Sequence, residues 1–148
     1  IPVQTLSSGV ISVTSGEYHT MFVKDDYSLW GLGQNTNGQL GDGTIIDRQS
    51  PVQITTDVTY VTAGYKHTVF LKKDGSLWGT GLNHVGQLGD GTNSDRHSPI
   101  RIEASNVVFV AAGGYNTFYI KTGKIFIIEN LNKCDHQKEH LLILHKPL

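Results

Sequence analysis

The sequence is poor in several features that would mark particular classes of protein. It has one cysteine, Cys134, so it forms no internal disulfide, and this count leaves the cellular compartment open. No apolar run reaches the roughly 18 residues that a membrane-spanning helix needs. A formal net charge of -1 provides no field to hold a phosphate backbone or an anionic membrane surface. We therefore expect neither nucleic acid nor a membrane as a partner.

Motifs for cofactors are also missing, although the chain has 17 glycines. Gly31-Leu32-Gly33 and Gly79-Thr80-Gly81 lack the third glycine of a dinucleotide fingerprint, and no Gly-Lys-Ser/Thr follows to bind a triphosphate. Asp42-Gly43 and Asp90-Gly91 lack the alternating acidic ligands of a calcium loop. These glycines indicate turns and close strand approach, and we expect no cofactor.

What the chain does contain is a tandem repeat. SLWGLGQNTNGQLGDGT at 28–44 returns as SLWGTGLNHVGQLGDGT at 76–92, with a period of about 48 residues that also aligns the flanking residues. Such a period is typical of propellers and solenoids. Ile1–Gln4 align with Ser50–Gln53, so the chain is expected to begin within a repeat array.

We divide the chain into units at about 10–57 and 58–106, with a partial unit at 107–126. Together with the preceding residues they form a repeat region, 1–126. The remaining 127–148 lacks glycine and departs from the pattern. This atypical tail fits an added terminal element, a truncation or a shift of reading frame.

Each unit is rich in β-formers separated by turn residues. The strands are expected to begin near Val10, Thr20 and Leu29 and at the equivalent positions of later units. Pro51 and Pro99 favour an edge position for the last strand of each unit. Four strands per unit predict an all-β fold: an incomplete β-propeller with two full four-stranded blades, partial flanking blades and the atypical tail.

The patterns LWGxGxNxxGQLGDGT, DRxSPxxI and VxAGxxHTxxLxxDGxLW resemble repeats of the regulator of chromosome condensation family. The resemblance covers about residues 1–126 and implies a β-propeller, which usually has seven blades in this family. Two to three units do not close such a ring, so a strand edge and an apolar blade face are left open at each end. The chain then fits a fragment of a longer protein, a ring completed by self-association, or an open wedge capped by the tail.

The resemblance implies a platform for binding another protein. Some family members promote nucleotide exchange on a small GTPase of nuclear transport, and a bacterial relative inhibits β-lactamases outside the cell. We find no counterpart of the wedge by which the exchange factor acts. The expected function is therefore a non-enzymatic interaction module, with an exchange factor for a small GTPase or a secreted inhibitor-type fragment as alternatives.

The most promising binding residues lie where the units differ between matching flanks. These are the pairs Glu17-Tyr18, Tyr65-Lys66 and Gly114-Tyr115. Tyrosine supplies a large contact area at a low entropy cost, so the turns are candidates for a binding patch at one end of the propeller. Packing between adjacent blades is the alternative role. Ile45-Ile46, replaced by Asn93-Ser94 in the second unit, is a second variable site.

The recurring histidines, Asp-Arg pairs and tryptophans are each expected to stabilise the fold. His19 and His67 recur without a nucleophile at a fixed spacing, so they predict hydrogen-bonded structural histidines and no catalytic site. The pairs Asp47-Arg48 and Asp95-Arg96 are expected to tie the long connection to a neighbouring blade. Trp30 and Trp78 are expected in the core.

One cluster in the tail has the residue types of a metal site. Cys134, His136, His140 and His145 supply atoms that zinc accepts, and a helix would place His136 and His140 on one face. Their spacing matches no common zinc module, which favours a solvated polar tail.

Overall fold

The computed structural model of the chain describes residues 9–128, and these form eleven β-strands and no helix. The first sheet contains β1 (Val10–Ser15), β2 (His19–Lys24), β3 (Leu29–Gly33) and β4 (Arg48–Thr55). The second contains β5 (Val58–Ala63), β6 (His67–Lys72), β7 (Leu77–Gly81) and β8 (Arg96–Glu103). The third contains β9 (Val107–Ala112), β10 (Thr117–Lys121) and β11 (Lys124–Ile128).

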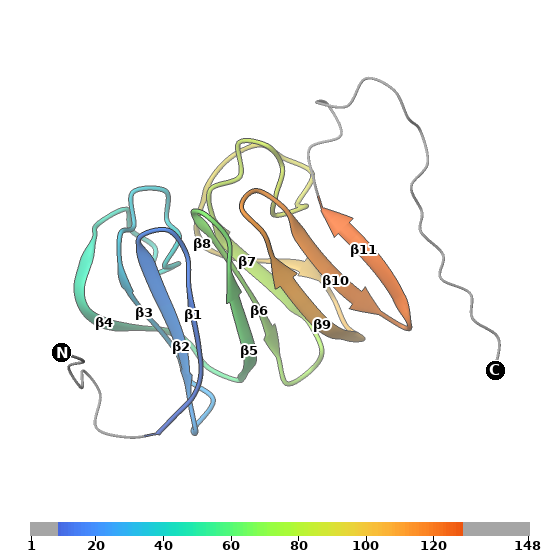
Figure 1. Cartoon of the computed structure of the whole chain (residues 1–148), viewed down its shortest axis with the longest axis horizontal. Coiled ribbons are helices and arrows are strands. Elements are labelled where there is room, and N and C mark those ends of the chain that lie inside the picture. The colour runs from blue at the N-terminus through green and yellow to red at the C-terminus, as the bar shows by residue number, and fades with distance from the viewer. Residues whose placement is uncertain (1–8, 129–148) are drawn as a thin grey trace.

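Each sheet is an antiparallel meander whose spatial order follows the chain. The first strands of successive sheets contact one another, β1 with β5 and β5 with β9, so they form the inner side of a fan. Figure 1 shows the three sheets side by side, with the first at the left and the third at the right. Strands β4 and β8, which contain Pro51 and Pro99, lie at sheet edges as expected. The predicted incomplete β-propeller is confirmed.

Two apolar cores fill the spaces between the sheets. The first joins Met21, Val23 and Leu29 of one sheet to Val58 and Phe70 of the next. The second repeats this arrangement one sheet later with Val69, Leu71, Leu77, Val107 and Tyr119. Because side chains alternate along a strand, each sheet sends one set of side chains into each neighbouring space.

The glycine-rich connection folds around one buried asparagine in each full unit. Asn35 Nδ2 donates to Asp42 Oδ1 at 2.9 Å and to the Thr44 carbonyl at 3.0 Å, while Asn35 Oδ1 accepts from the Leu40 amide at 2.9 Å. Asn83 makes the same contacts in the second unit. These bonds hold a long loop rigid and direct the leucine of Gly-Gln-Leu-Gly into the core.

The Asp-Arg pairs divide their roles between the connection itself and the next blade. Arg48 Nε donates to Asp42 Oδ2 at 2.6 Å, and Arg96 binds Asp90 in the same way, so both arginines stabilise their own connection. Asp95 Oδ2 accepts from Asn37 Nδ2 of the preceding unit at 2.9 Å. The expected tie between blades is therefore made by Asp95 alone among these four residues, whereas Asp47 accepts from the Asn35 amide of its own unit at 2.7 Å.

The tryptophans, expected in the core, are only partly buried. Trp78 packs against the first core, its indole N–H donates to Ser76 Oγ at 2.8 Å, and the Lys72 ammonium lies 4.9 Å from the ring centroid. Trp30 repeats this arrangement in the first sheet. An indole with a polar tip and a lysine across its face suits the margin of a sheet better than its centre.

A glycine at the start of each inter-sheet contact permits close approach. A Cβ atom on Gly64 would lie 2.1 Å from His67 Cε1 and 2.4 Å from the Gly113 carbonyl oxygen of the next sheet. The equivalent Gly113 has only Phe118 and Asn116 atoms nearby, at 3.9 and 4.0 Å, because its unit has no histidine and no following sheet in the described residues.

This difference predicts opposite outcomes for the same substitution. Gly64→Ala should lower the free energy of unfolding by about 3 kcal/mol or more, since backbone of the next sheet has to move. Gly113→Ala should change it by less than about 0.5 kcal/mol. Urea denaturation of dilute protein measures both, and equal effects would contradict the close approach described at Gly64.

Candidate functional site

Three turns gather at one end of the fan. Glu17-Tyr18 lies between β1 and β2, Tyr65-Lys66 between β5 and β6, and Gly114-Tyr115 between β9 and β10. The hairpins that follow the second strand of each sheet point to the opposite end, because the strands are antiparallel. The sheet topology therefore places all three predicted pairs on a single surface.

Backbone hydrogen bonds join the three turns in series. The Glu17 amide donates to the Tyr65 carbonyl at 3.1 Å, and the Tyr65 amide donates to the Gly114 carbonyl at 2.9 Å. Because these bonds already fix the backbone of the turns, little backbone freedom is lost when a partner binds there.

All three tyrosine side chains are exposed, and two of them, Tyr65 and Tyr115, touch across blades. Their exposed fractions are 63% for Tyr18, 39% for Tyr65 and 45% for Tyr115. The Tyr65 and Tyr115 rings lie 5.4 Å apart between centroids, and His84 meets the edge of Tyr115 at 5.7 Å. The two roles considered for these residues, display and contact between blades, thus coexist. We refer to Tyr18, Tyr65, Tyr115 and His84 as the aromatic ladder.

Charged residues of the same turns set the chemistry around the ladder. A hydrogen bond with Glu17 raises the pKa of Tyr65 to about 12, so its hydroxyl stays protonated at physiological pH. The Lys66 ammonium lies 5.8 Å from the Tyr65 ring centroid. One acidic and one basic side chain therefore flank the aromatic surface, and no single sign of charge dominates it.

Directly beneath the turns, each histidine connects its sheet to the next. His19 Nε2 lies 3.0 Å from Thr68 Oγ1, whose hydroxyl donates to the Gln39 carbonyl at 2.8 Å. His67 makes the same contact with Thr117 at 3.1 Å. Since the hydroxyl proton is already committed to a carbonyl, the histidine has to donate from Nε2. The prediction of hydrogen-bonded structural histidines is confirmed.

Burial lowers the pKa of His19 and of His67 from 6.5 to about 4. Both rings are therefore neutral at physiological pH and act as hydrogen-bond donors within the fold. The partner of each ring is the hydroxyl of a fully buried threonine, and that hydroxyl donates its proton to a backbone carbonyl.

The remaining sequence candidates fall outside this surface or outside the described residues. Ile45 and Ile46 are exposed on the first glycine-rich connection. Cys134, His136, His140 and His145 lie beyond residue 128, so the weak zinc hypothesis stays a prediction. Within residues 9–128 no group of three or more histidine, cysteine or acidic side chains is positioned to hold a metal ion. No helix within that range is long and apolar enough to span a membrane.

Comparison with known proteins identifies the repeat. The regulator of chromosome condensation (RCC1) repeat matches residues 27–71 and 74–120, which together make up more than half of the chain. The chain belongs to the RCC1 repeat family. A second form of the RCC1 repeat matches residues 58–87.

Among curated proteins, the ultraviolet-B receptor UVR8 of Arabidopsis thaliana is 44% identical over 52 residues, or 34% of this chain and 12% of UVR8. Among solved structures, human WBSCR16 aligns with a TM-score of 0.75 at 25% identity, covering 86% of this chain and 34% of that one. Yeast RCC1 (Prp20) bound to Kap60 aligns with a TM-score of 0.72 at 24% identity, covering 88% and 32%. The chain thus spans about a third of the length of these structures, and the likeness concerns the fold.

Sequence reasoning missed two parts of this RCC1-repeat surface. His84 lies within the repeat's variable Asn-x-x-Gly stretch, where Thr36 occupies the equivalent place in the first unit. The sequence predicts Thr68 and Thr117 as strand residues, although their recurrence directly after His67 and Asn116 is a usable signal. Thr68 donates to the Gln39 carbonyl and Thr117 to the Gln87 carbonyl. Each pair is distant in the sequence, and only the folded chain brings its two residues together.

The buried histidines predict a loss of stability in mild acid. Between pH 6.5 and about 4 the unfolded chain binds more protons than the folded one, so the stability present above pH 6.5 declines as the pH falls. From about pH 8 to about pH 5 the free energy of unfolding should drop by about 2 kcal/mol for each histidine.

His67→Asn, which installs the residue found at position 116, should remove about half of this pH dependence. The measurement is urea denaturation over a series of pH values for both proteins. An unchanged slope in the variant would show that His67 does not titrate as described.

Proposed function

We propose that this RCC1-repeat chain is a non-enzymatic module that binds another protein through the aromatic ladder. The observation that supports the proposal is the continuous set of exposed tyrosines on turns that are joined by backbone hydrogen bonds. Exposed aromatic side chains at one rigid surface are typical of protein interfaces and are costly to leave in water.

The character of the ladder favours a protein over a small molecule. The surface is a row of turns with exposed side chains. Its polar groups are the tyrosine hydroxyls, with the Glu17 carboxylate and the Lys66 ammonium beside them. Tyrosine combines apolar area with a hydroxyl that donates or accepts, which suits a partner surface of mixed polarity. Because Glu17 and Lys66 have opposite charges, we expect the affinity to depend only moderately on salt.

A second candidate function is nucleotide exchange on a small GTPase. It is supported by the fold shared with Prp20p of Saccharomyces cerevisiae, described as binding Gsp1p and histones, at 19% identity and a TM-score of 0.67. An inhibitor-type fragment acting outside the cell has the family resemblance alone to support it. Both are forms of protein binding, and they differ in the partner.

The ladder is tested by replacing Tyr18, Tyr65 and Tyr115 together with alanine. A photo-crosslinking residue at position 84 first captures the bound protein, which is then purified and titrated by calorimetry. The triple variant should bind about 100-fold more weakly or worse, because central tyrosines are frequent hot spots. Unchanged affinity with an intact fold would refute the ladder as the binding surface.

The matched control is Tyr27→Gly, which removes an exposed tyrosine from the opposite end of the fan. Tyr27 has φ 64°, where the second unit has Gly75 at φ 76°, so glycine suits this turn. The control should fold and bind like the unaltered chain. An equal loss of affinity in Tyr27→Gly would mean that the binding surface is not confined to the ladder end.

The exchange activity is tested with a small GTPase of the nuclear-transport type loaded with a fluorescent nucleotide. A catalyst would accelerate nucleotide release many-fold at substoichiometric concentration, whereas the interaction module should leave the rate unchanged. Acceleration that persists after removal of the three tyrosines would favour exchange through another surface.

A further inference from the structure

The first and third sheets of the fan each have one face that takes no part in the two cores. Each core between sheets is built from a leading face, contributed by the sheet that comes later, and a trailing face, contributed by the sheet before it. The chain joins such faces twice. The first sheet's leading face and the third sheet's trailing face have no sheet against them among residues 9–128.

The leading face is marked by a valine that occupies the same repeat position three times. Val61 and Val110 are 2% and 0% exposed because they lie in the two cores, whereas Val13 is 66% exposed. Val10 is likewise exposed, although its equivalents Val58 and Val107 are buried. The first sheet therefore displays on β1 the valines that later sheets use to pack against a preceding one, whereas Phe22, the equivalent of the core residue Phe70, is 2% exposed.

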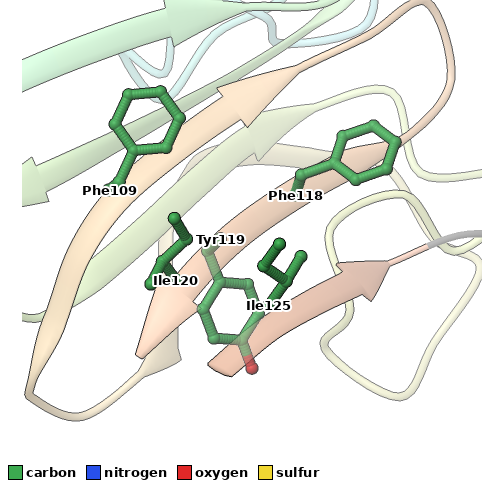
Figure 2. A pocket seen from close by; sticks show the side chains of 5 residues that line it. All are labelled: Phe109, Phe118, Tyr119, Ile120 and Ile125. Carbon is green, nitrogen blue, oxygen red and sulfur yellow. The ribbon is translucent and has the colours of Figure 1, made fainter. Parts of the chain in front are cut away.

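The trailing face shows the reverse pattern. Leu29 and Leu77 are fully buried in the first and second cores, whereas their equivalent in the third sheet, Ile125, is 44% exposed. Ile125 pairs with Ile120 across β10 and β11. Figure 2 shows these two isoleucines on neighbouring strands. Both line a hollow of about 240 Å³. The hollow is lined by Phe109, Phe118, Tyr119, Ile120 and Ile125.

The hydrogen bonds between sheets also have equivalent positions on the two open faces. His19 and His67 each donate across to a threonine of the following sheet, Thr68 and Thr117. Thr20 occupies this threonine position in the first sheet, and Asn116, which has an amide donor, occupies the histidine position in the third. If another first sheet were placed after the third sheet, its Thr20 would face Asn116 and its exposed valines would face Ile125.

From this correspondence we propose that the open trailing face of one copy binds the open leading face of a second copy. The contact continues the interface that the chain already forms twice, with the same residue positions on each side. It is head-to-tail, since the two faces differ, and such contacts either close into a ring or extend. Two copies bring together six sheets, within the range of four to eight blades found in closed propellers, so a dimer is the expected species.

Sedimentation velocity of the full 148-residue chain, from low to high micromolar concentration, measures the contact. The average mass should rise from that of one chain toward twice that value. Val13→Lys on the leading face and Ile125→Lys on the trailing face should each weaken association by at least about 30-fold, because a charge is placed in an apolar interface. Both positions are exposed in the single chain, so the variants should keep the fold, which circular dichroism checks.

Mixing the two variants distinguishes a head-to-tail contact from other modes. Val13→Lys keeps an intact trailing face and Ile125→Lys an intact leading face, so the mixture should form a heterodimer through one contact while neither variant associates alone. Gly113→Ala offers an uncharged third variant, since its equivalent Gly64 admits no Cβ beside the next sheet.

The control is Ile11→Lys, on the same strand as Val13. Ile11 is exposed, and its equivalents Thr59 and Val108 are exposed too, so this position belongs to neither face. The variant should associate like the unaltered chain. A chain that stays monomeric at every concentration, an association that survives Val13→Lys and Ile125→Lys, or a mixture that fails to associate would overturn the proposal.

Discussion

A β-sheet with two apolar faces needs a neighbour on each side, and this requirement governs the whole chain. Each unit places one set of strand side chains toward the sheet before it and the alternate set toward the sheet after it. A single blade of this kind would leave both faces in water, so the units stabilise one another mainly by contact between nearest neighbours. The glycine, histidine and threonine that recur in each junction fix the distance and orientation of that contact.

The same junction also determines what the surface displays. The residues that link neighbouring turns through their backbone lie next to the buried histidine bridge, so the exposed tyrosines stand on a part of the fan that is held by hydrogen bonds between sheets. A binding surface there is preorganised, because the energy that positions it comes from the packing of the blades. Variation between units is concentrated in side chains that leave this backbone unchanged, and repeats can in this way keep a fold while altering a surface.

Much of this arrangement could be predicted from the sequence because the repeat supplied its own alignment. The period fixed which residues are equivalent, the β-branched and aromatic residues of 20–24 predicted a strand, and Pro99 predicted an edge. The partial exposure of Trp78 could not be predicted, since the repeat pattern does not show that its side chain only flanks the first core. The contact of His84 with Tyr115 and the bond from Thr68 to the Gln39 carbonyl join residues that only the packing of sheets brings together. Local pattern predicts elements and their order, whereas contacts between loops depend on the angle between blades.

If neighbours stabilise each sheet, protection from hydrogen exchange should vary along the fan. Strand β6 lies in the one described sheet that has a sheet on both sides, while the sheets that contain β2 and β10 each pack against one other sheet among residues 9–128. Native-state hydrogen exchange of dilute protein, followed by NMR, measures the free energy of opening at each amide. The account predicts that the amides of β6 open only with global unfolding, and that those of β2 and β10 open at a lower free energy. Equal protection in all three sheets, or the highest protection at either end, would contradict it.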